Sequence, residues 1–325
     1  MGFEVSRRFA LTALAASFAV LGSEPARAAV TLRVAKAVAQ SPGYLPLDIG
    51  MKYGIFAAHG LAVEELDLAG GAKVAQAIAA GSVDLALSAG PDMAFTAKGA
   101  PQIAVASISS SPAFIGITVG EQSPIRNVGG LKGKKIGVAS QGLATWLVDE
   151  LNKAKGWTGS DRATPVVISG SPTANLAAME AGEVDATING VVEGWRLEER
   201  KQGRLLLEVA DYLGPFQLYV MFASTALVQR DPAAIRRFLA AWLESVAYTQ
   251  SHEAETTQAM RDVLGYSPAI AGRCYDEIIP KLSSDGRFDP KALAGLFASF
   301  TDLKILPPTA DLSKLYTEQF LPRAI

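Results

Sequence analysis

The sequence predicts an α/β protein built from two similar lobes, and three observations indicate this fold class. Strand-like and helix-like segments alternate along the first two thirds of the chain, and the alternation restarts near residue 130. The phrase AAGSVDLALSAG at 79–90 returns as EAGEVDATINGV at 180–191, with glycine, valine and aspartate at matching places. The C-terminal third is helical. A chain of 325 residues is long enough for two lobes that each bury a core.

The segments of the first lobe follow one another as β-α-β units. Alternating and β-branched residues predict strands, and apolar residues at helical spacing predict the helices between them. The predicted strands are VTLRVAKA (30–37), LAVEELDL (61–68), VDLALSAG (83–90) and PQIAVASISS (101–110), and the predicted helices are LPLDIGMKYGIFAAHG (45–60) and GGAKVAQAIAAG (70–81). Short crossover helices imply a mostly parallel sheet.

The same alternation then begins again in a second lobe. Its predicted strands are GLKGKKIGVAS (130–140), TPVVISG (164–170) and VDATING (184–190), and its predicted helices are QGLATWLVDELNKAKG (141–156) and SPTANLAAMEAG (171–182). The extended segments at 113–120 and 217–224 are the candidate crossings between the lobes. Two such crossings would form a hinge.

Three helices of the C-terminal third begin at a recognisable cap. Asp231, Ser267 and Asp289 each precede a proline, and this pairing of an N-cap residue with a first-turn proline is typical of helix starts. An apolar stripe that includes Trp242 follows the first of them, so Trp242 is predicted to lie in the core. These helices are expected to pack on the first lobe.

The N-terminus resembles a signal peptide. Arg7 and Arg8 precede an apolar run at 9–22, and Ala26-Arg27-Ala28 supplies a small-residue cleavage site. We therefore expect cleavage after residue 28 and a periplasmic location, with export by either the Sec or the twin-arginine route. The net charge of −2 gives no basic surface for nucleic acid.

Several linked motifs resemble one family of binding proteins. PLDIGMKYGIFAAHGLAVE (46–64), followed by GGAKVAQAIAAGSVDLALSAG (70–90), resembles the nitrate/sulfonate/taurine and thiamine-pyrimidine binding proteins of bacterial ABC importers, an NMT1/SsuA-like family. The segment at 123–157 resembles that family's second-lobe opening, and AAMEAGEVDATINGVVEGW (177–195) resembles its second switch loop. The similarity extends from about residue 31 to about residue 225.

The resemblance implies a type II periplasmic binding protein fold, with two Rossmann-like lobes, a two-strand hinge, and C-terminal helices packed on the first lobe. The expected division is a signal peptide at 1–28, lobe 1 at 29–115, lobe 2 at 116–218, and a return to lobe 1 at 219–325. It also implies a monomeric solute-binding component of an ABC importer, which closes around a sulfonate, organic acid or pyrimidine-like solute and meets a membrane permease. A ligand-presenting sensor module would look the same.

Ligands of open α/β sheets bind beyond the carboxyl ends of the strands, and this rule selects the candidate site. The candidate ligand-binding residues are Ser41, Gly43, Tyr44, Gly71, Ser88, Ala89, Ser140, Gly142, Thr145, Asn189, Glu193, Trp195 and Phe216. Ser88 and Asn189 occupy the same place in the repeated phrase, which predicts that the two phrases form equivalent walls of one cleft.

Two candidate loops open helices, where unpaired N–H groups and partial positive charge attract anions. Gly71 and Gly142 would let a ligand approach the backbone, or they only permit tight strand-to-helix turns. Ser88 and Asn189 would bond a ligand or cap their own loops.

Other candidate residues also have two interpretations. The aromatic residues Tyr44, Trp195 and Phe216 would wall the ligand or pack in the core. Glu193 would bind an ammonium group or point to solvent. No loop of the predicted cleft carries an arginine, although Arg196 follows Trp195, and this disfavours a strongly charged anion.

The sequence predicts no catalytic residues, cofactor or metal. Cys274 is the only cysteine, and His59, expected at a helix end, and His252 have no partner at metal-ligand spacing. There is no G-x-S-x-G elbow, and GGLKGKKIG lacks the Ser or Thr of a phosphate loop. A pyrimidine-phosphate-synthase-like enzyme on the same fold is the alternative, although such an enzyme uses a cysteine-rich cluster.

Overall fold

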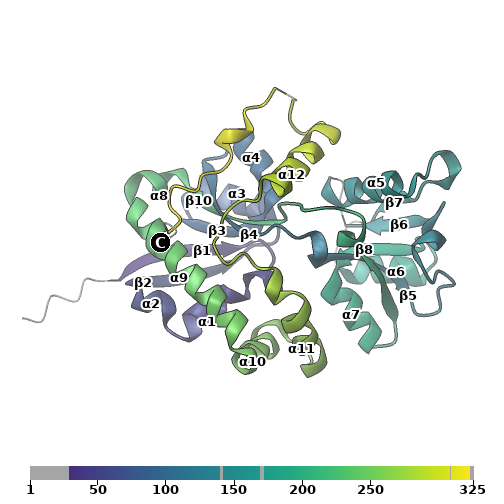
Figure 1. Ribbon diagram of the computed structural model, residues 1–325, viewed down its shortest axis with the longest axis horizontal. Coiled ribbons are helices and arrows are strands. Elements are labelled where there is room, and N and C mark those ends of the chain that lie inside the picture. The colour runs from purple at the N-terminus through teal and green to yellow at the C-terminus, as the bar shows by residue number, and fades with distance from the viewer. Residues whose placement is uncertain (1–28, 140–141, 169–171, 308, 323–325) are drawn as a thin grey trace, which may run out of the picture.

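Two five-stranded mixed sheets with helices packed against them form the two lobes of the molecule (Figure 1). The structure is a computed structural model that describes residues 29–139, 142–168, 172–307 and 309–322. The predicted signal peptide lies outside the described residues. The predicted α/β class with two lobes is confirmed. No helix among the described residues combines the length and apolar character needed to cross a bilayer.

Lobe 1 is built on a sheet with the strand order β2-β1-β3-β10-β4. Its strands are β1 (Val30–Lys36), β2 (Leu61–Asp67), β3 (Leu85–Ala89), β4 (Gln102–Ser109) and β10 (Tyr219–Ser224). The strand β1 pairs in parallel with β2 and β3, whereas β10 lies antiparallel between β3 and β4. The sheet is thus mostly parallel, as predicted, with one inserted strand that runs the other way.

Lobe 2 repeats this arrangement with the strand order β7-β6-β8-β5-β9. Its strands are β5 (Ile115–Gly120), β6 (Lys135–Val138), β7 (Thr164–Val167), β8 (Ala186–Gly190) and β9 (Gly203–Glu208). The strand β6 is parallel to β7 and β8, and β5 lies antiparallel between β8 and β9.

The predicted helices are present in order, one of them broken in two, together with two helices that the sequence analysis did not predict, at 93–97 and 191–199. Lobe 1 has α1 (Leu45–Lys52), α2 (Ile55–Ala58), α3 (Gly71–Ala79) and α4 (Met93–Ala97); lobe 2 has α5 (Leu143–Lys155), α6 (Pro172–Glu180) and α7 (Val191–Glu199). The single helix predicted over 45–60 is two helices, because Gly54 adopts a left-handed φ of 72° between them. His59 caps the end of α2, as expected.

The chain crosses between the lobes at residues 110–114 and 209–218 (Figure 1). These connecting segments are hydrogen bonded together: the Phe216 N–H donates to the Ser110 carbonyl over 3.0 Å, and the Leu218 N–H donates to the Ser109 carbonyl over 3.1 Å. The segments predicted to cross, 113–120 and 217–224, overlap these connections only at their first residues. Most of their residues lie in β5 and β10. Each crossing therefore ends in the antiparallel strand of the lobe that it enters.

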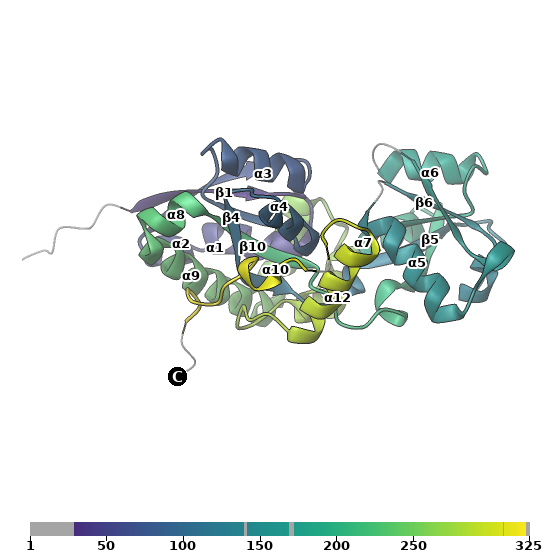
Figure 2. The ribbon, with the colours of Figure 1, turned by 90° about the horizontal axis from the view of Figure 1, so that it is seen from above.

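The C-terminal helices are α8 (Thr225–Arg230), α9 (Pro232–Ser251), α10 (Glu253–Leu264), α11 (Pro268–Glu277) and α12 (Pro290–Asp302). The three predicted N-caps are confirmed, because Asp231, Ser267 and Asp289 each accept a hydrogen bond from a backbone N–H of the first turn. In Figure 2, α1 and α9 lie on one side of the lobe 1 sheet and α3 on the other. Trp242 of α9 is 1% exposed and belongs to the core, as predicted.

The repeated phrase has a structural explanation at its aspartate. Asp84 accepts the Arg33 N–H over 3.1 Å and returns its own N–H to the Arg33 carbonyl over 2.9 Å. Asp185 makes the same pair of bonds with Lys135, over 2.9 and 2.8 Å. The matching letters thus join β3 to β1 and β8 to β6 where β3 and β8 begin, at the edge opposite the predicted cleft.

Candidate functional site

A cavity of about 350 Å³ lies between the lobes and is lined by both. This volume falls in the range of roughly 300–1,000 Å³ that is typical of small-molecule sites. Lobe 1 and the C-terminal helices contribute Val38, Gln40, Ser41, Pro42, Tyr219, Tyr266 and Ile278, and lobe 2 with its connection contributes Phe114, Ile115, Gly190, Val191, Val192, Glu193 and Arg196. A larger cavity of about 540 Å³ lies within lobe 2 alone, so a ligand there would not bridge the lobes.

The wall of the cavity is mainly apolar and aromatic, with one acid and one base. Glu193 and Arg196 are three residues apart on α7 and therefore share a face of that helix. Trp195 lies between them in the sequence, so the twist of the helix places its side chain on another face of α7. The predicted cleft loops carry no arginine, but the helical phase of α7 carries Arg196 into the cavity wall.

The Arg196 guanidinium already has partners within the protein. Its Nη2 donates to the Leu264 carbonyl over 3.1 Å, and its Nη1 lies 3.6 Å from a Glu193 carboxylate oxygen. The group also lies over the Tyr266 ring, 5.1 Å from the centroid. Glu193 is therefore paired with Arg196 instead of pointing freely to solvent.

The turn between β1 and α1 forms one wall. Ser41 lines the cavity and is 4% exposed, and its side chain interacts with that of Tyr219, which opposes the rise in the pKa of Tyr219 that burial causes. Gly43 lies behind it, where a Cβ would come within 3.2 Å of the Tyr219 ring. Tyr44 packs edge-on against Tyr219 with ring centroids 5.2 Å apart, and burial is the main cause that raises the pKa of Tyr44.

Three candidates from lobe 1 gather around a residue that the sequence analysis did not select, Asp92. The Ser88 hydroxyl is hydrogen bonded to the Asp92 carboxyl group, and the Ala89 N–H donates to it over 3.3 Å. A Cβ on Gly71 would overlap the same carboxyl group. Burial raises the pKa of Asp92, although the bonds from Ser88 and Ala89 oppose that shift. Asp92 follows β3 by three residues, and this place beyond the carboxyl end of a strand is the signal that could have selected it.

The lobe 2 candidates are more dispersed. Ser140 lies outside the described residues. Gly142 precedes α5 with a φ of 106°, and the buried Thr145 hydroxyl has no partner among the described residues. The Asn189 side chain donates to Thr187 over 3.0 Å and lines a hollow of about 60 Å³ beside the main cavity. Contact of these residues with a ligand stays a prediction.

Two aromatic candidates pack in the protein and not on the cavity wall. Trp195 is 2% exposed, and the Arg273 guanidinium covers its ring at 4.3 Å from the centroid. Phe216 is 1% exposed and packs on Trp146 of lobe 2, with ring centroids 5.5 Å apart. In contrast, Tyr266 lines the cavity without a sequence signal, since tertiary packing alone brings the loop after α10 there.

Comparison with known proteins assigns the chain to a family. The family model described as NMT1/THI5 like matches residues 42–256, which is most of the chain. The chain belongs to the NMT1/THI5-like family. This NMT1/THI5-like protein is 27% identical to a putative thiamine biosynthesis protein of Haemophilus influenzae over 85% of this chain and 88% of the relative.

Solved structures share the fold of this NMT1/THI5-like protein. The periplasmic aliphatic sulphonate binding protein SsuA from Escherichia coli matches with a TM-score of 0.74 and 19% identity, over 88% of this chain and 92% of that one. The alkanesulfonate-binding protein SsuA from Xanthomonas axonopodis, bound to MOPS, matches with a TM-score of 0.72 and 20% identity, over 91% and 99%. At such identities the likeness confirms the two-lobed periplasmic binding protein fold alone.

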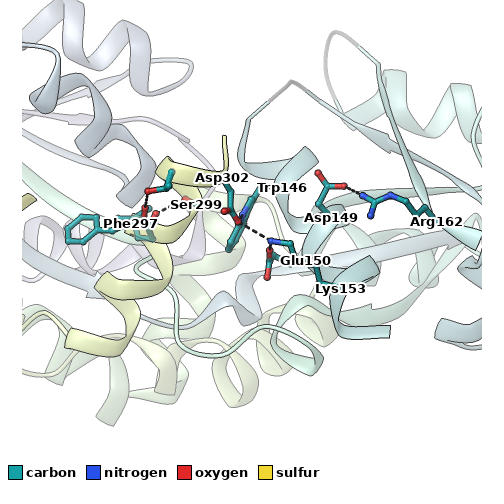
Figure 3. A network of polar contacts seen from close by, with 10 residues as sticks. Trp146, Asp149, Glu150, Lys153, Arg162, Phe297, Ser299 and Asp302 are labelled. Carbon is teal, nitrogen blue, oxygen red and sulfur yellow. Dashed lines mark hydrogen bonds and ion pairs between the residues drawn. The ribbon is translucent and has the colours of Figure 1, made fainter. Parts of the chain in front are cut away.

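Polar contacts bridge the lobes of the NMT1/THI5-like chain on either side of the connecting segments. In Figure 3, Asp302 at the end of α12 accepts from Trp146 Nε1 and from Lys153 Nζ of α5, both over 3.0 Å. We call Asp302, Trp146 and Lys153 the clasp. A second bridge joins Arg273 of α11 to Glu198 of α7 at 3.0 Å. Both bridges stabilise the present arrangement of the lobes.

Replacing Asp302 with asparagine is expected to loosen the clasp. Because the Asp302 and Lys153 side chains are 42% and 57% exposed, the loss should be about 0.5–1 kcal/mol in favour of a more open form. The Trp146 and Lys153 bonds hold the pKa of Asp302 below its usual value. The clasp is therefore fully formed at pH values above the usual pKa of an aspartate. It is lost as the pH falls through the lowered pKa of Asp302.

Small-angle scattering of the unliganded protein would measure this loosening as a larger radius of gyration. Asp149→Asn is the matched control, because Asp149 pairs with Arg162 within lobe 2 at 2.5 Å (Figure 3). Equal radii for the wild type and both variants would contradict the role of the clasp.

Proposed function

We propose that this protein is the extracytoplasmic solute-binding component of an ABC import system. It captures a small organic solute between its lobes and closes around it. The observation that carries this proposal is the divided wall of the 350 Å³ cavity, to which both lobes contribute. A ligand that touches both lobes favours the form in which they approach, so binding shifts an open–closed equilibrium.

The paired connecting segments support the hinge in this proposal. They are hydrogen bonded to each other, and each leads into a strand, β5 or β10, that lies between two other strands of its sheet. Rotation of backbone dihedrals in 110–114 and 209–218 would move one lobe without disrupting either core. We place the lobe boundaries near residues 115 and 218 on this ground.

The remaining parts of the proposal concern the cell. A signal peptide at 1–28 would carry the protein to the periplasm, where it would act as a monomer. The closed form would then dock on a membrane permease that accepts the solute. Names among the relatives point to sulfonates and to thiamine-related compounds, so the solute class proposed is a sulfonate, an organic acid or a pyrimidine-like molecule.

The test begins with the solute itself. Mass spectrometry of small molecules released from the purified native protein should identify a bound compound. Adding that compound to emptied protein at saturation should lower the radius of gyration measured by small-angle scattering. A compound of similar size that causes no thermal shift serves as the control.

Two outcomes would count against the proposal. Saturation with an unchanged radius of gyration would contradict hinge closure. Chemical conversion of the compound during incubation with the protein would favour the enzyme alternative, whereas recovery of the unchanged compound supports a binding role.

A further inference from the structure

The start of α3 is faced by a carboxyl group of the protein itself. Gly71 is the first residue of α3, and the Asp92 carboxyl group lies where a Cβ of Gly71 would be. Asp92 is fixed there by the Ser88 hydroxyl and by the Ala89 N–H. Helix starts attract anions, and the Asp92 carboxyl group lies beside the first residue of this helix.

This acid lies next to the wall of the inter-lobe cavity. Ala89, which donates to Asp92, is the register partner of Tyr219 across β3 and β10. Tyr219 lines the cavity and packs on Tyr44. Burial, Tyr219 and Asp92, in that order, raise the pKa of Tyr44, so Asp92 acts electrostatically on the residues behind this wall.

Two buried hydroxyls lie at this wall and just behind it. Tyr44 is 1% exposed, lies behind the lining and has a hydroxyl without a partner in the described part of the chain, whereas the Ser41 side chain, 4% exposed, interacts with Tyr219. Neutral hydroxyls suit a polar, uncharged group of a ligand. No compensating cation is free nearby among the cavity-lining residues, because Arg196 is engaged by Glu193 and the Leu264 carbonyl.

We propose that Asp92 makes the cleft selective against anionic solutes, so that the group of the ligand that faces lobe 1 is neutral or cationic. An anion at this wall would be repelled by the Asp92 carboxylate behind the lining or would have to drive a proton onto it, and either costs binding free energy. This inference rests on the proposed solute-binding function and narrows its solute class: it excludes sulfonates in spite of the shared fold.

Three ligands that share a benzene ring but are anionic, neutral and cationic test the proposal. Isothermal titration of the full mature chain would use benzenesulfonate, benzamide and benzamidine as probes. The wild type should bind benzamide or benzamidine at least about tenfold more tightly than benzenesulfonate. Asp92→Asn keeps the size of the side chain and removes its charge, and it should reduce this preference by about tenfold.

Controls decide between Asp92 and other causes. Glu193→Gln removes the acid of the cavity wall. The proposal would be overturned if the preference for benzamide or benzamidine over benzenesulfonate were lost in Glu193→Gln but kept in Asp92→Asn. It would also be overturned by a wild type that binds benzenesulfonate as tightly as benzamide, or by an Asp92→Asn variant with an unchanged preference or with no binding of any probe. Asp92→Ser, checked by circular dichroism, replaces Asp92→Asn if that variant does not fold, and is judged by the same outcomes.

The result is separable from the test of function. A protein that closes around its native compound but shows no charge preference contradicts this inference and leaves the proposed function intact. A protein that releases no compound and binds none contradicts the function itself.

Discussion

Replacing Lys36 with alanine is expected to lower the free energy of unfolding by about 3–5 kcal/mol. The Lys36 side chain is 1% exposed in β1, and its Nζ lies 2.9 Å from an Asp48 carboxylate oxygen and 2.7 Å from one of Glu65. Burial alone would lower the pKa of Lys36, but the two acids more than offset this and raise it. Without Lys36, two partly buried acids of α1 and β2 would face each other unpaired.

Urea unfolding followed by circular dichroism would measure the loss. Lys52→Ala is the matched control, since Lys52 pairs with Asp262 at 3.4 Å while both side chains are about half exposed. Its effect should stay within about 0.5 kcal/mol. Similar unfolding midpoints for the two variants would show that the buried pair contributes no more than a surface one.

Replacing Gly90 with alanine is expected to cost about 1–3 kcal/mol and to weaken ligand binding. The Gly90 N–H donates to the Leu218 carbonyl over 2.8 Å, and a Cβ would overlap the Gln217 carbonyl oxygen. The Gln217 backbone is held in place, because the buried side-chain amide of Gln217 donates to the Ser107 hydroxyl and to the Tyr219 carbonyl, each over 2.9 Å. Displacing it would move the connection and Tyr219 of the cavity wall together.

Thermal unfolding and ligand titration would check both effects of Gly90→Ala. Gly272→Ala in α11 is the control, since nothing lies within 4 Å of a Cβ there and alanine favours a helix by about 1 kcal/mol. A Gly90→Ala protein as stable as Gly272→Ala, with unchanged affinity, would disprove the close packing of the connection.

Much of the fold follows from local patterns in the sequence. The spacing of hydrophobic residues and the cap residues are local features of the sequence. Asp231, Ser267 and Asp289 therefore mark helix starts correctly. The antiparallel placement of β5 and β10 is not local. It depends on pairing between segments that are far apart, such as β10 with β3, and no pattern within 217–224 encodes its direction.

The site was harder to predict because it depends on the direction in which each single side chain points. Trp195 and Arg196 are neighbours on α7, and one position is enough to place Arg196 in the cavity wall and to bury Trp195 in the core. Asp92 was missed because its contact with Gly71 joins two loops of the sheet edge. The clearest signal, the repeated phrase, marks Asp84 and Asp185, which hold strands together away from the cavity.

The inserted strand β10 has a consequence for how the chain folds during synthesis. When residues up to 114 have left the ribosome, β3 and β4 each keep an unpaired edge, because their shared neighbour lies at 219–224. Unpaired edges promote association with other chains. Residues 115–208, in contrast, supply every strand of their own sheet. The nascent protein therefore completes the sheet of lobe 2 first, and the sheet of lobe 1 is complete only after residues 219–224 have emerged.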